Sequence, residues 1–192
     1  MALTIRDIER VFDEHGHLGY AGEPVTQLAH ALQAATLAEA DGADDALVTA
    51  TLLHDLGHML NLQGETPTAR GIDDTHQYFA IPFLRGTFGA AVLEPIRLHV
   101  DAKRALCALE PGYFDALSED SRRSLKLQGG IYSPAEADAF VAKAYAKDAM
   151  RLRRWDDEAK VAGTVTPPLA HFLEIASRVV RQPLPLQTRQ EP

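Results

Sequence analysis

Residues 45–58 read DALVTATLLHDLGH, a stretch in which an apolar run ends in the pair His54-Asp55. The run up to Leu53 is apolar enough to lie in the interior of a helical protein, and Gly57 then permits a sharp exit or a close backbone approach. A buried aspartate with no cation beside it in the sequence costs free energy unless a positive charge compensates it. This stretch therefore predicts a buried helix that delivers metal ligands to the core.

Further candidate ligands lie on both sides of this pair. His30 precedes it, His76 and His99 follow it, and Asp156 comes much later, in the sequence RRWD. Each lies in a segment that we expect to be helical. Histidine and aspartate side chains that reach the interior from several helices can hold two metal cations in a bundle. Because Cys107 is the only cysteine, a thiolate zinc finger is excluded.

Each of these residues also has a simpler interpretation when it is taken alone. His30 and His99 could be core histidines that hydrogen-bond to a backbone carbonyl. His76 could begin a helix after Asp73-Asp74-Thr75, and Asp156 could pair with a neighbouring arginine. All of these interpretations would have to hold at once, so we predict a shared metal site instead.

Helical periodicity dominates the chain, and the alternating pattern of β-strands is nearly absent. The sequence therefore predicts an all-α fold, with one domain over residues 1–182 and a flexible C-terminal tail over residues 183–192. Glycines and prolines mark the loops between helices. The expected helices are 4–14, 25–41, 44–58, 75–86, 90–107, 118–127, 134–145, 146–157 and 167–181.

Composition limits the class of protein. The chain has 192 residues and a net charge of −8, which argues against nucleic-acid binding because such proteins need a basic surface. No long apolar segment or signal peptide is evident, so we expect a cytoplasmic protein with no membrane partner. Lys103 and Arg153 place positive charge near two of the candidate ligands, where it would suit a small anion.

The order of the candidate ligands resembles the HD-domain superfamily, and specifically its branch of mixed-valent di-iron oxygenases, which includes relatives of myo-inositol oxygenase. The resemblance extends to the PhnZ/TmpB-type oxygenases, which cleave the carbon–phosphorus bond of 1-hydroxyphosphonates, and covers roughly residues 18–160. The segments that carry it are Tyr20-Ala21-Gly22-Glu23, Leu53-His54-Asp55-Leu56-Gly57-His58, His99-Val100-Asp101-Ala102-Lys103-Arg104, Leu117-Ser118, residues 121–130 (SRRSLKLQGG) and Arg153-Arg154-Trp155-Asp156.

This resemblance implies an HD-domain helical bundle with a buried pair of irons, Fe(II)/Fe(III), and O2 as co-substrate. The implied ligands of the first iron are His30, His54, Asp55 and Asp156. Asp55 would bridge to a second iron, which His76 and His99 complete. Tyr20 would occupy the place of the substrate until the substrate binds. The resemblance gives catalytic roles to Tyr20, Glu23 and His58.

The same resemblance implies a phosphonate pocket formed by His58, Lys103, Ser121, Ser124, Gln128 and Arg153. Glu23 and Asp101 would face a cation on the far end of the substrate, with the ring of Tyr20, Tyr78, Phe79 or Tyr113 beside it. This predicts (1R)-1-hydroxy-2-(trimethylammonio)ethylphosphonate as substrate, with glycine betaine and phosphate as products.

Three alternatives remain open at this point. The substrate could be 2-amino-1-hydroxyethylphosphonate, which would give glycine and phosphate. The chain could instead be a metal-dependent HD phosphohydrolase, or an HD module that binds a ligand without catalysis. The sequence specifies neither the oligomeric state nor the role of Arg70, which also departs from the pattern of the enzyme that acts on the amino compound.

Overall fold

Several helices begin at residues whose side chains cap the first turn. The computed structural model describes residues 2–20, 22–64, 67–73 and 75–181. Thr4, Thr26 and Asp44 each accept a hydrogen bond from the backbone three residues ahead, and so do Ser118 and Ser133. Such caps satisfy backbone N–H groups that have no partner within the helix, which fixes where each helix starts.

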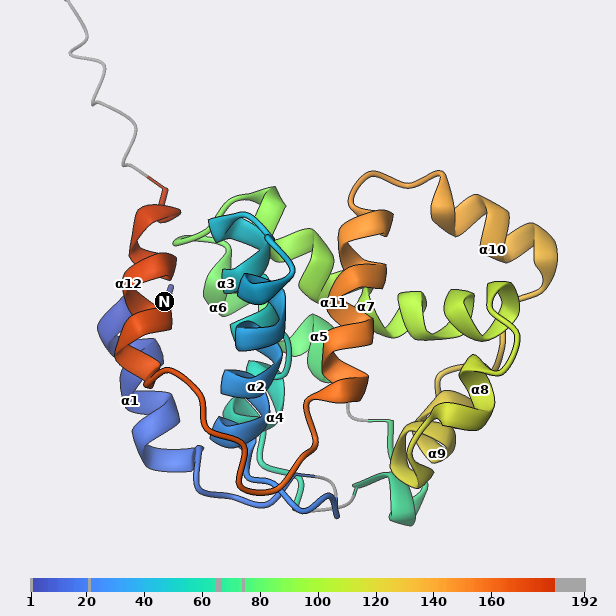
Figure 1. The fold of residues 1–192 in the computed structure, drawn as a ribbon, viewed down its shortest axis with the longest axis horizontal. Helices are drawn as coiled ribbons and strands as arrows, with labels where there is room; N and C mark the ends of the chain where they lie inside the picture. Colours follow the sequence, from blue (N-terminus) through green and yellow to red (C-terminus); the bar gives the residue numbers. More distant parts are fainter. Residues whose placement is uncertain (1, 21, 65–66, 74, 182–192) are drawn as a thin grey trace, which may run out of the picture.

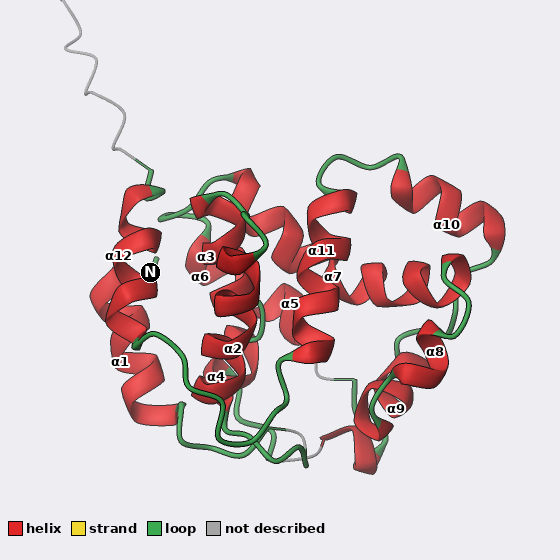
Figure 2. Cartoon of the chain, in the orientation of Figure 1, coloured by secondary structure: helices red, strands yellow, loops and turns green. Residues whose placement is uncertain are grey.

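The described residues form helices joined by loops, without any strand (Figure 2). The all-α prediction is confirmed. No described helix is long and apolar enough to cross a membrane. The elements are α1 (Ile5–His15), α2 (Gln27–Ala40), α3 (Asp45–Leu53), α4 (Leu56–Leu60), a 3-10 helix (Pro67–Arg70), α5 (His76–Phe79), α6 (Ile81–Leu84), α7 (Ala90–Leu109), α8 (Tyr113–Ala116), α9 (Glu119–Leu127), α10 (Pro134–Val141), α11 (Ala146–Glu158) and α12 (Leu169–Arg178).

Helix α3 lies in the middle of the bundle and packs against α2, α7 and α12, while α11 packs along α2 and α7. Figure 1 shows α1 and α12 on one side of this group and α8, α9 and α10 on the other. One hydrophobic cluster, which includes Phe12, Leu52 and Phe172, fills the first side. A smaller cluster around Leu98 and Phe140 fills the space between α7, α10 and α11. Burial of apolar side chains on both sides holds α2, α3, α7 and α11 together at the centre.

Two expected helices are interrupted in the structure. The helix predicted over residues 44–58 stops at Leu53 and resumes at Leu56, because Asp55 has a non-helical backbone with φ −103° and ψ 12°. The helix predicted over residues 75–86 divides into α5 and α6 at Ala80, just before Pro82. Proline lacks an N–H group, so it begins a new helix more readily than it continues an old one.

Other boundaries differ by smaller amounts. Helix α10 ends at Val141, short of the predicted residue 145, and α12 ends at Arg178 instead of residue 181. The short helix α8 was not predicted, since four residues give too little periodicity to detect. The tail predicted for residues 183–192 lies outside the described residues.

Candidate metal centre

All the candidate metal ligands meet at the middle of the bundle, and all are buried. They come from five places in the fold: His30 from α2, His54 and Asp55 from the break between α3 and α4, His76 from the start of α5, His99 from α7, and Asp156 from α11. Residues that are far apart in the sequence are thus brought together by helix packing, as a site in a bundle core requires.

The break between α3 and α4 explains how His76 reaches the others. A methyl group on Gly57 would lie 2.2 Å from the backbone oxygen of His76, so only glycine permits this approach. The residue before His76, Thr75, has a left-handed backbone with φ 49°. Together these features place the start of α5 directly against α4 and turn His76 toward Asp55.

The ligand atoms form two groups that share Asp55. One contains His30, His54 and Asp55, and the other contains Asp55, His76 and His99, with the atoms of each group within 4.8 Å of one another. In the first group the Nε2 atoms of His30 and His54 are 3.2 Å apart. In the second, those of His76 and His99 are 3.0 Å apart. Oδ1 of Asp156 adjoins the first group, 3.4 Å from Nε2 of His30.

The orientation of three histidine rings suits metal binding. Nδ1 of His30 faces the carbonyl oxygen of Ala159 at 2.9 Å, Nδ1 of His54 faces that of Thr51 at 2.8 Å, and Nδ1 of His99 faces that of Ile96 at 2.7 Å. A carbonyl only accepts, so each Nδ1 carries a proton and each Nε2 faces the centre. Burial also lowers the pKa of His30 to about 4 and that of His99 well below its usual value, which keeps both rings neutral.

The carboxylate of Asp55 fits a role as a shared ligand. Its Oδ2 lies 3.4 Å from Nε2 of His54, and its Oδ1 lies 3.3 Å and 3.7 Å from Nε2 of His76 and His99. Oδ1 is buried and has no hydrogen-bond partner of its own among the described residues. Burial would raise the pKa of Asp55, but the neighbouring histidines hold it well below its usual value, so the group is charged. A cation in each of the two histidine groups would satisfy one oxygen of this carboxylate.

Tyr20 covers the same carboxylates. Its hydroxyl donates a 2.8 Å hydrogen bond to Oδ2 of Asp55, and Oδ1 of Asp156 lies 3.5 Å away. Its ring stacks on His30 with the two centres 3.9 Å apart. Burial, with the charges of Asp156 and Asp55, raises the pKa of Tyr20 well above its usual value. The hydroxyl of Tyr20 thus lies where a further ligand could approach the centre.

A cavity of about 290 Å³ opens beside the two groups, and its wall includes Tyr20, His58 and parts of the centre itself. One end of the wall carries hydroxyl, amide and cationic side chains. Nζ of Lys103 donates to Oγ of Ser124 at 2.7 Å, and Nη2 of Arg153 donates to Oγ of Ser121 at 3.3 Å. This end offers an anion several hydrogen-bond donors at once.

Gln128 and His58, the other two residues of the predicted phosphonate pocket, also line the cavity. Oε1 of Gln128 is buried and has no hydrogen-bond partner among the described residues. His58 stacks on the ring of His76 at 4.0 Å, and its Nε2 lies 3.9 Å from Oδ2 of Asp55. The six residues predicted to form the phosphonate pocket therefore all line this cavity.

The two acids predicted to face a substrate cation lie elsewhere. Asp101 follows His99 by two positions on α7, and a rotation of about 200° separates such side chains on a helix. It is 3.9 Å from Lys143 rather than in the cavity wall. Glu23 lines a separate shallow hollow beside Thr26 and Gln33. Neither position supplies a carboxylate to the cavity in this arrangement.

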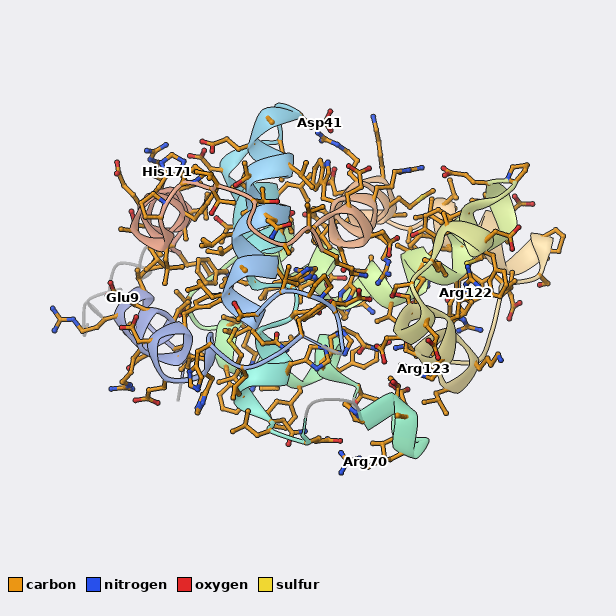
Figure 3. The ribbon with its side chains drawn as sticks, turned by 60° about the horizontal axis from the view of Figure 1, so that its bottom comes forward. Glu9, Asp41, Arg70, Arg122, Arg123 and His171 are labelled. Carbon is orange, nitrogen blue, oxygen red and sulfur yellow. The ribbon has the colours of Figure 1, made fainter. Side chains whose placement is uncertain are left out.

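Of the four rings predicted to lie beside the substrate cation, only that of Tyr20 belongs to the described part of the cavity wall. The described residues that form its wall do not include Tyr78, Phe79 or Tyr113. Arg70 donates to the backbone oxygen of Gln63. Figure 3 shows Arg70, the last residue of the 3-10 helix, at the outer edge of the molecule.

Some residues around the cavity were not predicted from the sequence. Asp157 accepts hydrogen bonds from Arg153, and Lys160 lies over the ring of Tyr20, 5.9 Å from its centre. Arg104 donates to the backbone oxygens of Gly129 and Gly130, which fixes the turn that follows Gln128. Of these residues, only Asp157 could have been predicted from the sequence, because it stands four positions after Arg153 and so shares a helix face with it.

The chain is similar to two named oxygenases over most of its length. A hydroxymethylphosphonate dioxygenase of Gimesia maris is 42% identical over 169 residues, which cover 88% of this chain and 84% of that protein. The 1-hydroxy-2-(trimethylamino)ethylphosphonate dioxygenase (glycine-betaine-forming) of Leisingera caerulea is 38% identical over 170 residues, which cover 88% of this chain and 87% of that protein.

A protein of Acanthamoeba polyphaga mimivirus, described as uncharacterized protein L432, is 31% identical over 171 residues, covering 88% of this chain and 78% of that protein. No protein-family model matches the chain. The two named relatives share a reaction class, and the buried His and Asp groups suit a metal-dependent enzyme of that class. The chain therefore belongs to the PhnZ-type family of phosphonate dioxygenases, which break the carbon–phosphorus bond of 1-hydroxyphosphonates oxidatively.

Proposed function

We propose that this enzyme oxidises a small 1-hydroxyphosphonate with O2 and releases phosphate and a carboxylic acid. The observation that carries the proposal is that the His/Asp centre and a cationic, hydroxyl-lined pocket open into one cavity. A 1-hydroxyphosphonate has a hydroxyl group and a phosphonate on the same carbon, so it can reach both at once. An ordinary phosphate ester lacks that hydroxyl group.

The donor set supports iron as the metal. His30, His54, Asp55 and Asp156 would hold one ion, and Asp55, His76 and His99 would hold the second. Imidazole and carboxylate ligands with open positions are typical of non-haem iron that reacts with O2. When bound, an Fe(II)/Fe(III) pair would supply the redox chemistry that side chains lack.

The chain's own residues would bind and orient the substrate. Lys103, Arg153 and the nearby serine hydroxyl groups would hold the phosphonate oxygens, and Gln128 would offer its amide N–H group. Tyr20 would leave Asp55 and Asp156 as the substrate arrives, since its hydroxyl adjoins both carboxylates. Binding would thereby direct C1 of the substrate toward the centre, which lowers the entropic cost of the reaction.

Hydroxymethylphosphonate is the substrate that the cavity supports best. Its only carbon carries no further group, so no cation site is needed, and the sum HOCH2PO3H2 + O2 → HCOOH + H3PO4 balances. A quaternary ammonium group is held by aromatic faces and diffuse negative charge. Among the described residues of the cavity wall, Tyr20 is the only phenylalanine, tyrosine or tryptophan. The 42% identity to a hydroxymethylphosphonate dioxygenase supports the same choice.

A second candidate is (1R)-1-hydroxy-2-(trimethylammonio)ethylphosphonate, which would give glycine betaine and phosphate. One observation favours it: Glu23 lies three positions after Tyr20, and its backbone N–H donates to the backbone oxygen of Tyr20 at 2.7 Å. A movement of Tyr20 away from the centre would therefore also move Glu23. The similarity to a glycine-betaine-forming relative is consistent with this candidate.

The deciding experiment measures phosphate release under O2 from both candidates and from 2-amino-1-hydroxyethylphosphonate. Metal analysis and EPR on the same preparation should find two irons per chain and a mixed-valent signal, with Asp55→Ala as the inactive control. Preference for either cationic compound would displace hydroxymethylphosphonate. Hydrolysis of a phosphate ester without O2, together with no turnover of any phosphonate, would replace the oxygenase by a phosphohydrolase.

A further inference from the structure

Arg153 is, with Lys103, one of two buried cations among the described residues at the anion-binding end of the cavity, and each of its nitrogens has a partner. Nη1 contacts Oδ2 of Asp156 at 2.7 Å, and Nη2 donates to Oγ of Ser121. The opposite edge of the guanidinium group, Nε and Nη2, donates to both oxygens of Asp157, with Nε 3.2 Å from Oδ2. The direction of the guanidinium plane is therefore set by the two-point contact with Asp157 together with the contact to Asp156.

Asp157 is itself held in place from outside the cavity. The hydroxyl of Tyr113, on the short helix α8, donates to Oδ2 of Asp157. Burial raises the pKa of Tyr113, with Asp157 adding to the effect, so the phenol stays protonated and able to donate. Lys160 adds a weaker contact, with Nζ 3.9 Å from Oδ1. Neither Tyr113 nor Asp157 is among the described residues that line the cavity.

We propose that Asp157, braced by Tyr113, is a positioning residue that orients Arg153 toward the phosphonate of the substrate. The proposal rests on the assignment of this cavity end to a phosphonate. Arginine has several rotatable bonds, and a free guanidinium would lose rotamer entropy on binding an anion. Fixing it beforehand removes that cost, which strengthens binding.

The direction in which anion affinity changes when Asp157 is removed distinguishes a positioning role from an effect of its charge alone. Asp157 is an anion close to where another anion binds, so by Coulomb repulsion alone its removal should strengthen anion binding. If Asp157 instead orients Arg153, its removal should weaken binding. Tyr113→Phe gives a test without any change of charge, because it removes only a hydroxyl group, which donates to Asp157 and also adjoins Arg153.

The experiment uses the metal-loaded enzyme and orthophosphate, the product, as the binding probe. Calorimetry would compare wild type with Asp157→Asn and Tyr113→Phe, and steady-state kinetics would follow KM and kcat separately. Glu158→Gln is the matched control, since Glu158 is the next residue on α11, is exposed and carries the same charge. Metal content and melting temperature would be recorded for each variant.

We expect Asp157→Asn to weaken phosphate binding by about tenfold, the scale of one lost charge-assisted hydrogen bond. KM should rise more than kcat falls, with two metals retained. Tyr113→Phe should weaken phosphate binding and raise KM by about threefold each, in line with the loss of a neutral hydrogen bond. Glu158→Gln should change neither phosphate binding nor KM. Unchanged or tighter phosphate binding in Asp157→Asn would overturn the proposal.

If Asp157→Asn does not fold, Tyr113→Phe decides alone, and unchanged phosphate affinity in that variant counts against positioning. Failure of the proposed function would look different. In that case wild-type enzyme would release no phosphate from any 1-hydroxyphosphonate, while the effect of both variants on orthophosphate binding would still be measurable.

Discussion

Asp55 is the residue on which both groups of candidate ligands depend. Its two carboxylate oxygens face different pairs of histidines, so it is the one member common to both groups. The other residues serve one group each. Replacing Asp55 should therefore reduce metal binding more than replacing any other single ligand, because it removes negative charge from two metal sites at once.

This difference predicts the metal content of two variants. Asp55→Ala should bind neither iron, whereas His99→Ala should lose mainly the second and keep the first, which His30, His54, Asp55 and Asp156 would still hold. Metal analysis of each purified variant gives the stoichiometry per chain. Two irons retained by Asp55→Ala would show that the ligand assignment is wrong.

Lys103 predicts how anion binding changes with pH. Burial, followed by the positive charge of Arg153, lowers the pKa of Lys103 to about 7. Lys103 is thus mostly charged below this pH and mostly neutral above it, and only the charged form attracts an anion. Affinity for orthophosphate should fall as pH rises through about 7, and binding above that pH should take up protons.

Orthophosphate titrates in the same range, so the measurement needs a variant with a permanent charge. Lys103→Arg keeps the cation at every pH in question, because the pKa of arginine lies above 12. Calorimetric titrations from about pH 6 to about pH 9 should show a steeper loss of affinity in wild type than in Lys103→Arg. Parallel curves would mean that Lys103 does not titrate in this range.

At the scale of elements, three of the candidate metal ligands lie where helices end or begin rather than in the middle of a long helix. The turn between α3 and α4 presents His54 and Asp55, and the close approach of α4 to α5 presents His76. Gly57 makes that approach possible, since a side chain there would overlap the backbone of His76.

Gly57→Ala should therefore displace His76 and reduce occupancy of the second metal site more than that of the first. The overlap is with backbone, so we expect a loss of stability of about 1–3 kcal/mol as well. Gly89→Ala is the control, because a methyl group there would meet only Arg181, at 3.9 Å. Metal stoichiometry and denaturant unfolding of the two variants test this, and full occupancy of both sites in Gly57→Ala would contradict it.

Some elements could be predicted from the sequence and others could not. Long helices such as α2, α7 and α11 were predicted because their apolar periodicity extends over several turns. The break at Asp55 was not, because it is stabilised by contacts with α5 rather than by any helix-breaking residue at that position. Asp101 shows the same limit at the site: its place in the sequence suggested the cavity, but the rotation of α7 directs it to Lys143.

For the whole molecule, the centre joins helices that are far apart in the sequence. Its residues come from α2, α5, α7, α11 and the α3–α4 turn, which lie between α1 and α12 on one side and α8, α9 and α10 on the other. Buried carboxylates repel one another unless a cation lies between them. A bound metal should therefore stabilise the native state against unfolding, as any ligand of the folded form does.

Removal of the metals by a chelator should lower the melting temperature. At a free metal concentration 100 times the dissociation constant, each site contributes about 2.7 kcal/mol, which corresponds to roughly 5–10 °C for a chain of this size. Calorimetry before and after chelation measures the shift. Asp55→Ala is the control, and a chelator effect of equal size in that variant would assign the shift to something other than the centre.

Part of the cavity wall comes from residues 61–64 and 67–73, which contribute none of the candidate metal ligands. Two of its apolar side chains, Leu62 and Ile72, are 57% and 38% exposed, so few neighbours constrain them. If the proposed substrate binds in this cavity, these residues would lie beside it without holding the metals. Mutations among them would then be expected to change which group on C1 is accepted, while the helices and the metal ligands stay the same.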